Sequence, residues 1–365
     1  MKVALVHDYL FEQGGAENVF AVMAEMFPDA PIYTAIYNPD TVAPVFRARD
    51  VRTSFLQRIT TDKRKAKALL PLYPMAFERM KLRGYDLVLS SSSSFAKGID
   101  AGDARHVCYC YSPPHFLWQT DRYIEQVRQP VQRAAIHLAT GLLRARDRRD
   151  ADNVDLFIAI SRLVQERIRR IYHRDAAVIY PPIDIGEFHV AGPAQVEDYL
   201  LVVSRLLPNK RVDIVIDACN VLGLPLVVVG DGPDRARLVA MAGPTVTMRG
   251  RLPRPEVVDL LSRCRAFVFP GEEDFGLTPL EAMASGRPVV AYRAGGALET
   301  VVEGVTGTFF DRQTVESVVD ALRAFDATRF APGQLRAHAA AFDQTSFKEQ
   351  LSEMLGESEF EIANA

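Results

Sequence analysis

The feature that most constrains the fold is an alternation of short apolar runs with helical patterns, which occurs twice along the 365 residues. In the first half, helical patterns separate several of these runs. This alternation is typical of a parallel sheet that helices cover on both faces. The strands predicted in the first half are Val3–Val6, Ile32–Ile36, Asp86–Ser90, His106–Tyr111, Leu156–Ile160 and Val178–Tyr180. The first run is interpreted as a strand and not as a signal peptide.

A proline pair, Pro181-Pro182, interrupts the pattern, and we interpret residues 181–197 as a linker. The chain exceeds the size at which one core usually stops growing. We therefore predict an α/β protein with two Rossmann-like domains, at 1–183 and 184–365. A last helix at about 346–357 is a candidate to pack back on the N-terminal domain. Predicted strands of the second half are Leu200–Ser204, Leu226–Val229, Val246–Met248, Phe267–Phe269 and Val289–Ala291, with helices over 211–222, 233–242, 254–263, 279–285, 314–324 and 347–355.

Composition narrows the class of protein further. No apolar run approaches the ~20 residues of a membrane-spanning helix. Four scattered cysteines indicate buried packing in a reducing, hence cytoplasmic, compartment. Residues 1–183 hold 26 Lys and Arg against 20 Asp and Glu, a balance of +6, and the rest hold 17 against 26, a balance of −9. This asymmetry suggests that one half meets an anionic surface.

The segment with the strongest chemical pattern runs from Glu272 to Val290 as strand, acidic loop, short helix and strand. Pro279 suits the first helical position and Gly286 the position after the helix. The amides of Leu277 and Thr278 would then bind a diphosphate at the helix N-terminus. Two alternatives remain open from spacing alone. Glu281 can form a capping box with Thr278, and the three adjacent acids, Glu272, Glu273 and Asp274, can form a solvated loop.

Three glycine-rich or basic loops follow predicted strands. Ser204, Arg205 and Lys210 lie in a loop where arginine and lysine can hold phosphate oxygens, although a surface loop with two ordinary cations is an equal reading. Gly14-Gly15 allows close backbone approach to an anion. Gly230 and Gly232 lack the third glycine of a dinucleotide fingerprint, as does Gly14-Gly15, so both are weak NAD signals.

Together these residues resemble the retaining GT-B glycosyltransferases of family four, over nearly the whole chain and most densely from Tyr199 to Gly307. Glu273 and Glu281 are similar to the family's E-x7-E motif. The diphosphate-binding loop is matched by Ser204-Arg205-Leu206 with Lys210, and the donor-phosphate loop of the first domain by Gly14-Gly15. Gly295-Gly296, Glu299 and Gly304–Gly307 continue the pattern.

The resemblance implies an active site in the cleft between the domains. Arg205 and Lys210 would neutralise the donor diphosphate, Glu281 would bind the ribose and Glu273 would lie beside the donor sugar. The implied donor-binding set is completed by Gly14, Gly15, Ser204, Asp274, Phe275, Gly276, Leu277 and Thr278. It also implies GDP-mannose or another nucleoside-diphosphate sugar as donor, and neither a metal nor a further cofactor.

One departure from the family concerns the segment from Cys110 to Trp118. Relatives that build surface polysaccharides often carry a histidine there, and its position falls on Tyr111 in this sequence. His115 is a candidate to act instead. The alternatives are that no side chain there acts as a base, or that Tyr111 serves packing only, since a lone histidine is more often structural.

The sequence therefore predicts transfer of a hexosyl group, with mannose as the expected sugar, to a glycan or lipid-linked acceptor. Nucleic acid is not an expected partner. The alternatives are another GT-B enzyme such as a sugar-nucleotide epimerase or a phosphorylase, a nucleotide-sugar-binding module without turnover, and an NAD-dependent oxidoreductase.

A basic stretch at 58–83 adds a membrane hypothesis. Its cations flank the apolar residues 69–77, and such a cluster can bind anionic lipid. The alternative is a solvated basic helix followed by a core segment. The cations in question are Lys63, Arg64, Lys65, Lys67, Arg79, Lys81 and Arg83.

Overall fold

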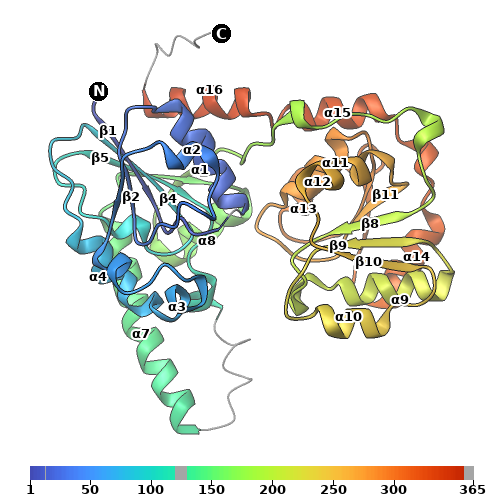
Figure 1. Cartoon of the computed structure of the whole chain (residues 1–365), viewed down its shortest axis with the longest axis horizontal. Coiled ribbons are helices and arrows are strands. Elements are labelled where there is room, and N and C mark those ends of the chain that lie inside the picture. Colours follow the sequence, from blue (N-terminus) through green and yellow to red (C-terminus); the bar gives the residue numbers. More distant parts are fainter. Residues whose placement is uncertain (13, 120–129, 357–365) are drawn as a thin grey trace. The chain divides into compact units, whose positions relative to one another are not determined.

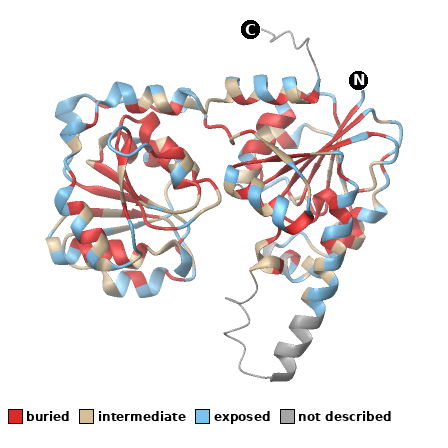
Figure 2. Cartoon of the chain, turned by 180° about the vertical axis from the view of Figure 1, so that it is seen from behind, coloured by how far each residue is buried: buried red, intermediate tan, exposed pale blue. Residues whose placement is uncertain are grey.

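The computed structural model describes residues 1–12, 14–119 and 130–356, which divide into two compact units. The first unit comprises Met1–Tyr180 with the chain from Leu351 onward, and the second comprises Pro181–Gln350. Each unit carries a parallel sheet with helices on both faces (Figure 1). The central strands are buried (Figure 2), and for this reason β8, β9 and β11 (Leu200–Val203, Leu226–Val229 and Ala266–Phe269) are continuous apolar runs without polar alternation.

In the first unit, the described residues form a seven-stranded parallel sheet. The chain runs outward from a central strand to one edge, returns beside that strand and then runs to the other edge. On one side of the central strand at Val3–His7 the sheet has two more strands, Ile32–Thr34 and the edge strand Val51–Thr53. In spatial order the strands are β3 (Val51–Thr53), β2 (Ile32–Thr34), β1 (Val3–His7), β4 (Leu87–Ser92), β5 (Arg105–Cys110), β6 (Leu156–Ala159) and β7 (Ala176–Val178).

The helices of the first unit begin and end at recognisable residues. The Ser161 hydroxyl accepts a hydrogen bond from the Val164 amide and starts α8, and His173 ends it in the left-handed region at φ 56°. Pro44 opens α2, a position where proline loses no helical hydrogen bond. These helices are α1 (Gly15–Met26), α2 (Pro44–Arg47), α3 (Lys63–Ala68), α4 (Tyr73–Arg79), α5 (His115–Trp118), α7 (Pro130–Asp152) and α8 (Arg162–Tyr172).

In the second unit, the described residues form a six-stranded parallel sheet with the same order of strands. The strands are β10 (Val246–Gly250), β9 (Leu226–Val229), β8 (Leu200–Val203), β11 (Ala266–Phe269), β12 (Val289–Tyr292) and β13 (Gly307–Phe310). The helices are α9 (Val212–Leu222), α10 (Arg235–Met241), α11 (Arg254–Arg263), α12 (Leu277–Ala284), α13 (Ala297–Thr300), α14 (Val315–Ala324), α15 (Pro332–Ala340) and the first part of α16 (Gln344–Leu355).

The predicted α/β class with two Rossmann-like sheets is confirmed. β4 continues beyond the predicted end at Ser90 as far as Ser92, into a run of serines at 90–94. The carboxylate of Asp8 holds the rest of the run in place, because it accepts backbone hydrogen bonds from Ser93, Ser94, Phe95 and Ala96 at 2.6–2.9 Å.

The end of α16 belongs to the first unit. Leu351 is fully buried there, and the Arg105 guanidinium donates to the Leu355 carbonyl at 3.0 Å. All four cysteines are free and buried. Cys108 and Cys110 lie two residues apart on β5.

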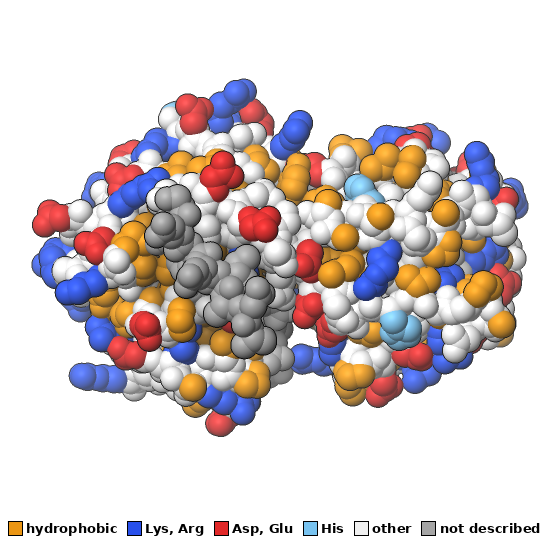
Figure 3. Space-filling view, turned by 90° about the horizontal axis from the view of Figure 1, so that it is seen from above, with side chains coloured by type: hydrophobic (Ala, Val, Ile, Leu, Met, Phe, Trp, Pro, Cys, Tyr) orange, Lys and Arg blue, Asp and Glu red, His pale blue; other side chains and the backbone are white. Residues whose placement is uncertain are grey.

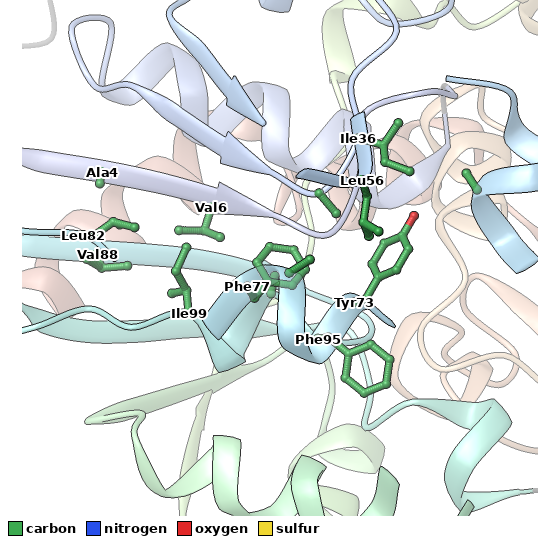
Figure 4. Close-up of a cluster of buried hydrophobic side chains, with 14 of the residues drawn as sticks. Ala4, Val6, Ile36, Leu56, Tyr73, Phe77, Leu82, Val88, Phe95 and Ile99 are labelled. Carbon is green, nitrogen blue, oxygen red and sulfur yellow. The ribbon is translucent and has the colours of Figure 1, made fainter. Parts of the chain in front are cut away.

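The apolar segment at 69–77 lies mainly inside the first unit. Tyr73, Ala76 and Phe77 are fully buried in a cluster that also contains Phe95 and Leu56 (Figure 4). In this segment Pro71 and Leu72 are exposed, Leu72 at 38%. The alternative of a core segment therefore holds for Tyr73, Pro74, Ala76 and Phe77, whereas the other residues of the segment are exposed or half-buried.

Basic and acidic side chains are interspersed on the face shown in Figure 3. The side chains of Lys63, Arg64 and Lys67 lie outside the described residues. Among the helices that the structure describes, none is both long enough and apolar enough to span a membrane.

Candidate functional site

The carboxyl edge of the second sheet brings two predicted loops together. β8 and β11 are neighbours in the sheet, but β8 continues toward β9 on one side and β11 toward β12 on the other. Parallel sheets bind ligands at such a reversal, outside the carboxyl ends of the strands. The loop after β8 carries Ser204, Arg205 and Lys210, and the loop after β11 carries residues 271–276.

Lys210 and Glu273 meet at this edge. The Nζ atom of Lys210 lies 2.7 Å from Oε1 of Glu273, and both side chains are partly exposed. Lys210 ends a 3₁₀ turn, Pro208–Lys210, and a Cβ on Gly271 would lie 3.2 Å from the Lys210 Cα. Glycine at 271 therefore allows the two loops to approach closely, and the ion pair forms across that contact.

The acidic loop leads into α12 through a strained turn. Gly276 precedes the helix at φ 87° and ψ 90°, a conformation that favours glycine, and a Cβ there would lie 2.8 Å from the Phe269 ring. The helix starts at Leu277, so the amides of Leu277 and Thr278 belong to its first turn. Amides of the first turn have no partner within the helix and can bind an anion.

Two expectations about this helix are wrong. Thr278 is not the N-cap and makes no capping hydrogen bond, because the left-handed turn at Gly276 starts the helix before it. The predicted capping box with Glu281 does not form, and Pro279 is the third helical residue and not the first. Gly286 follows the helix at φ 71°, as predicted.

Gly295 and Gly296 pack against the backbone of the acidic loop. The Gly296 amide donates to the Glu273 carbonyl at 2.8 Å. A Cβ on Gly295 would lie 2.4 Å from that carbonyl oxygen, and one on Gly296 would lie 2.2 Å from the Phe275 Cα. Only glycine fits at these two positions, so they fix the path of the backbone from Glu273 to Phe275.

Gly230 and Gly232 have a similar supporting function for the loop after β8. A Cβ on Gly230 would lie 1.8 Å from the Ser204 carbonyl oxygen, and one on Gly232 would lie 2.3 Å from that of Leu206. The Leu206 amide also donates to the Asp231 carbonyl at 3.0 Å. These glycines are explained by packing against residues 204–206. Within the described residues the exposed Arg205 side chain makes no ion pair.

Glu281 is held by an arginine that the sequence analysis missed. Arg254, the first residue of α11, lies 2.9 Å from Glu281 and donates two hydrogen bonds to Glu187 at 2.9 and 2.8 Å. Its guanidinium also lies over the Phe188 ring. Burial opposes the charge of Arg254, but the hydrogen bond to Glu187 and the charge of Glu281 raise its pKa overall. No local pattern links these distant positions.

In the first unit, Gly14 is the N-cap of α1 and Gly15 is its first residue. A Cβ on Gly14 would lie 2.7 Å from Oε2 of Glu17, so the Glu17 carboxylate folds over that glycine. A carboxylate in the first turn interacts favourably with the helix dipole. Gly14 ends the connection that leads from the carboxyl end of β1 into α1, so Gly14-Gly15 lies on the carboxyl side of the first sheet.

The two side chains considered for the family's histidine have different surroundings. Tyr111 follows β5 and is buried. His115 is half-buried and opens α5 after Pro114. The position of α5 is fixed by Trp118, whose indole N–H donates to Asp147 on α7 at 2.8 Å. The described residues contain no group of three or more His, Cys, Asp or Glu arranged to hold a metal.

Comparison with known proteins agrees with this arrangement. Residues 13–187 match the family Glycosyltransferase Family 4, and residues 187–338 match Glycosyl transferases group 1. The two matches together span both units.

Two relatives illustrate the similarity. The chain is 30% identical over 220 residues to a D-inositol 3-phosphate glycosyltransferase of Mycobacterium avium, covering 52% of each chain. It is 31% identical over 206 residues to a GDP-mannose-dependent alpha-(1-6)-phosphatidylinositol monomannoside mannosyltransferase of Mycolicibacterium smegmatis, covering 48% of this chain and 54% of the relative. The chain thus matches about half the length of these relatives.

A solved structure supports the fold. The Anabaena protein HepE in complex with UDP superimposes with a TM-score of 0.71 at 20% identity, covering 98% of this chain and 100% of HepE. The predicted GT-B class of two Rossmann-like domains is therefore confirmed.

Proposed function

We propose that this chain, which matches the models Glycosyltransferase Family 4 and Glycosyl transferases group 1, transfers a hexosyl group from a nucleoside-diphosphate sugar to an acceptor hydroxyl. The observation that carries the proposal is the pairing of Lys210 with Glu273 beside the N-terminus of α12. A cation, a carboxylate and unpaired helical amides then converge at the edge of the sheet where ligands bind.

The proposed reaction breaks the bond between the anomeric carbon and the diphosphate oxygen, whose electron pair leaves with the diphosphate. The acceptor oxygen bonds to the anomeric carbon, and its proton passes to the departing diphosphate oxygen. Lys210, Arg205 and the amides of Leu277 and Thr278 stabilise the charge that develops on the diphosphate, because they are held in place before the reaction. Glu273 lies beside the donor sugar and orients Lys210. Glu281, oriented by Arg254, binds the ribose hydroxyls.

We propose that the donor is GDP-mannose and that transfer retains the anomeric configuration. Relatives named as GDP-mannose-dependent mannosyltransferases support the donor, and the resemblance to family four supports retention. NMR of the anomeric proton in the product tests both. An inverted linkage would contradict the family-four mechanism, whereas activity with UDP-glucose in place of GDP-mannose would contradict the choice of mannose alone.

The proposed acceptor is a glycan or lipid-linked saccharide, met at the inner face of a membrane. The support is the positive balance of residues 1–183 and the basic stretch at 58–83. Because the aromatic residues of the apolar segment, Tyr73 and Phe77, are buried, attraction between charges is expected to dominate, at about 1 kcal/mol per cation. Co-sedimentation with phosphatidylserine vesicles should therefore weaken at raised salt. Absence of binding at low salt, or unchanged binding after substitution of the cations at 63–67 by alanine, would favour a soluble acceptor.

The alternative functions predict different products from one experiment. The protein is incubated with a panel of sugar nucleotides, with and without saccharide acceptors, and the released nucleoside diphosphate is measured. A transferase releases it only with an acceptor present. An epimerase converts the sugar nucleotide without an acceptor, and a binding module releases nothing although it binds the donor. An oxidoreductase would turn over only if a hydride acceptor were added.

A further inference from the structure

A buried row of hydrogen bonds crosses the first unit from β1 to α1. Nδ1 of His7 lies 3.0 Å from Oγ of Ser91, which lies 3.0 Å from the hydroxyl of Tyr111. The Tyr111 hydroxyl donates to the carbonyl of Ala16 at 2.8 Å. The row joins the carboxyl ends of β1, β4 and β5 to the first turn of α1, and its side chains are all buried.

The last acceptor fixes the direction of every hydrogen bond in the row. A carbonyl oxygen can only accept, so the Tyr111 hydroxyl proton points to Ala16. The proton between Ser91 and Tyr111 must then belong to Ser91. Because the Ser91 proton is used in this way, the proton between His7 and Ser91 must belong to Nδ1 of His7. Each hydroxyl donates once and accepts once, so the row has a single arrangement.

Both ends of the row reach the same turn. At one end, Tyr111 holds the Ala16 carbonyl. At the other end, Nε2 of His7 lies 3.8 Å from Oε1 of Glu17, whose other oxygen folds over Gly14. The hydrogen bond of Tyr111 therefore ties the first turn of α1 to the central strands of the sheet, and the other end of the row lies close to Glu17 in the same turn.

The Tyr111 hydroxyl is poorly suited to proton transfer. Burial raises its pKa well above the usual value, the hydrogen bond from Ser91 opposes this rise, and the nearby negative charge of Glu17 adds to it. Its only proton is already directed at a backbone carbonyl. By the resemblance to family four, Tyr111 falls on the position of the family's histidine, yet its contacts are those of a group that holds backbone in place.

We propose that Tyr111 is a positioning residue that holds the Gly14-Gly15 turn in the conformation that binds the donor diphosphate. This inference rests on the proposed function, in which that turn contacts the donor. The amides at the start of α1 can aim at a fixed point only if the turn is rigid, because a binding group that must first be ordered loses part of its effect.

The test compares Tyr111→Phe with Tyr109→Phe. Tyr109 lies on β5, two residues before Tyr111, is fully buried, and its hydroxyl donates a hydrogen bond to the backbone carbonyl of Ile179 at 3.0 Å. Each variant loses a buried hydroxyl of the same kind and keeps the ring, but only Tyr111 reaches α1. We expect Tyr111→Phe to lower kcat/KM for the donor by roughly threefold to tenfold, the range for one neutral hydrogen bond. Tyr109→Phe should leave it unchanged.

Two further readouts separate positioning from the other roles. The pH profile of kcat/KM should keep its shape in Tyr111→Phe, because no titrating group is removed. Amide hydrogen exchange at residues 15–18 should be faster in Tyr111→Phe than in Tyr109→Phe. Loss of one limb of the pH profile would overturn the inference in favour of proton transfer, and equal kcat/KM and equal exchange in both variants would leave Tyr111 a structural residue.

The failure of this inference can be told from failure of the proposed function. If the wild-type protein releases no nucleoside diphosphate with any donor and acceptor, the proposed function fails. The exchange measurement needs no turnover and still decides whether Tyr111 orders the turn. Ser91→Ala gives a second variant, which removes the partner of Tyr111 without touching its bond to Ala16, and a smaller change in the same direction is expected.

Discussion

Replacing Lys210 with alanine is expected to lower turnover by at least about 100-fold, the usual cost of losing one preorganised electrostatic group. In the structure this side chain is paired with Glu273 at 2.7 Å, and the two side chains are 19% and 29% exposed. A partly exposed ion pair contributes at most about 1 kcal/mol to the free energy of unfolding. A 100-fold loss of turnover corresponds to about 2.7 kcal/mol of activation free energy. The catalytic effect should thus clearly exceed the effect on stability.

The assay measures release of nucleoside diphosphate at saturating donor, together with urea unfolding of the same samples. Arg293→Ala is the matched control, because Arg293 forms ion pairs at 2.8 Å with Glu303 and 2.6 Å with Asp311 in the same unit. It should change stability by a similar amount and leave turnover unchanged. Glu273→Ala should behave like Lys210→Ala. Near-normal turnover in either folded variant would remove that residue from the proposed site.

Three further predictions follow from the contacts. Glu281→Gln should raise the KM for the donor roughly tenfold, because a charged hydrogen bond to the ribose becomes a neutral one; an unchanged KM in steady-state kinetics would contradict this role. Gly296→Ala should lower the free energy of unfolding by about 1–3 kcal/mol, since its Cβ would lie 2.2 Å from the Phe275 Cα. Gly333→Ala, whose Cβ would meet nothing within 4 Å, is the control in the urea titration, and equal stability of the two would refute the account. Burial lowers the pKa of His106 from 6.5 to about 4, so the unfolded chain binds its proton first and stability is lost as pH falls from 6.5 to 4. Urea unfolding at a series of pH values should show this decrease in the free energy of unfolding, at most about 1.4 kcal/mol per pH unit. In His106→Leu the contribution of His106 to the decrease should be absent.

The sequence predicted the fold well where its elements are long or bounded by strong signals. The helix at 254–263 and the strand at Leu226–Val229 were placed correctly, because proline or glycine and a clear apolar pattern mark their limits. The edge strands Val51–Thr53 and Gly307–Phe310 were missed, since runs of three or four residues resemble loops.

The candidate site was predictable in its residues but not in their contacts. Thr278 and Glu281 have the spacing of a capping box, yet the left-handed turn at Gly276 starts the helix earlier and leaves Glu281 to Arg254. That partner lies on another helix, so no local spacing reveals it. The pairing of Lys210 with Glu273 likewise depends on two strands that are neighbours in the sheet but distant in sequence.

The central claim is tested most directly by the dependence of nucleoside-diphosphate release on an acceptor. Paired reactions contain the protein and GDP-mannose, with or without a lipid-linked or free saccharide, and a parallel set uses other sugar nucleotides. The account predicts that release rises strongly when an acceptor is added and that it falls by at least about 100-fold in Lys210→Ala. Release that is equally fast without any acceptor, or that is the same in the wild type and in Lys210→Ala, would contradict it.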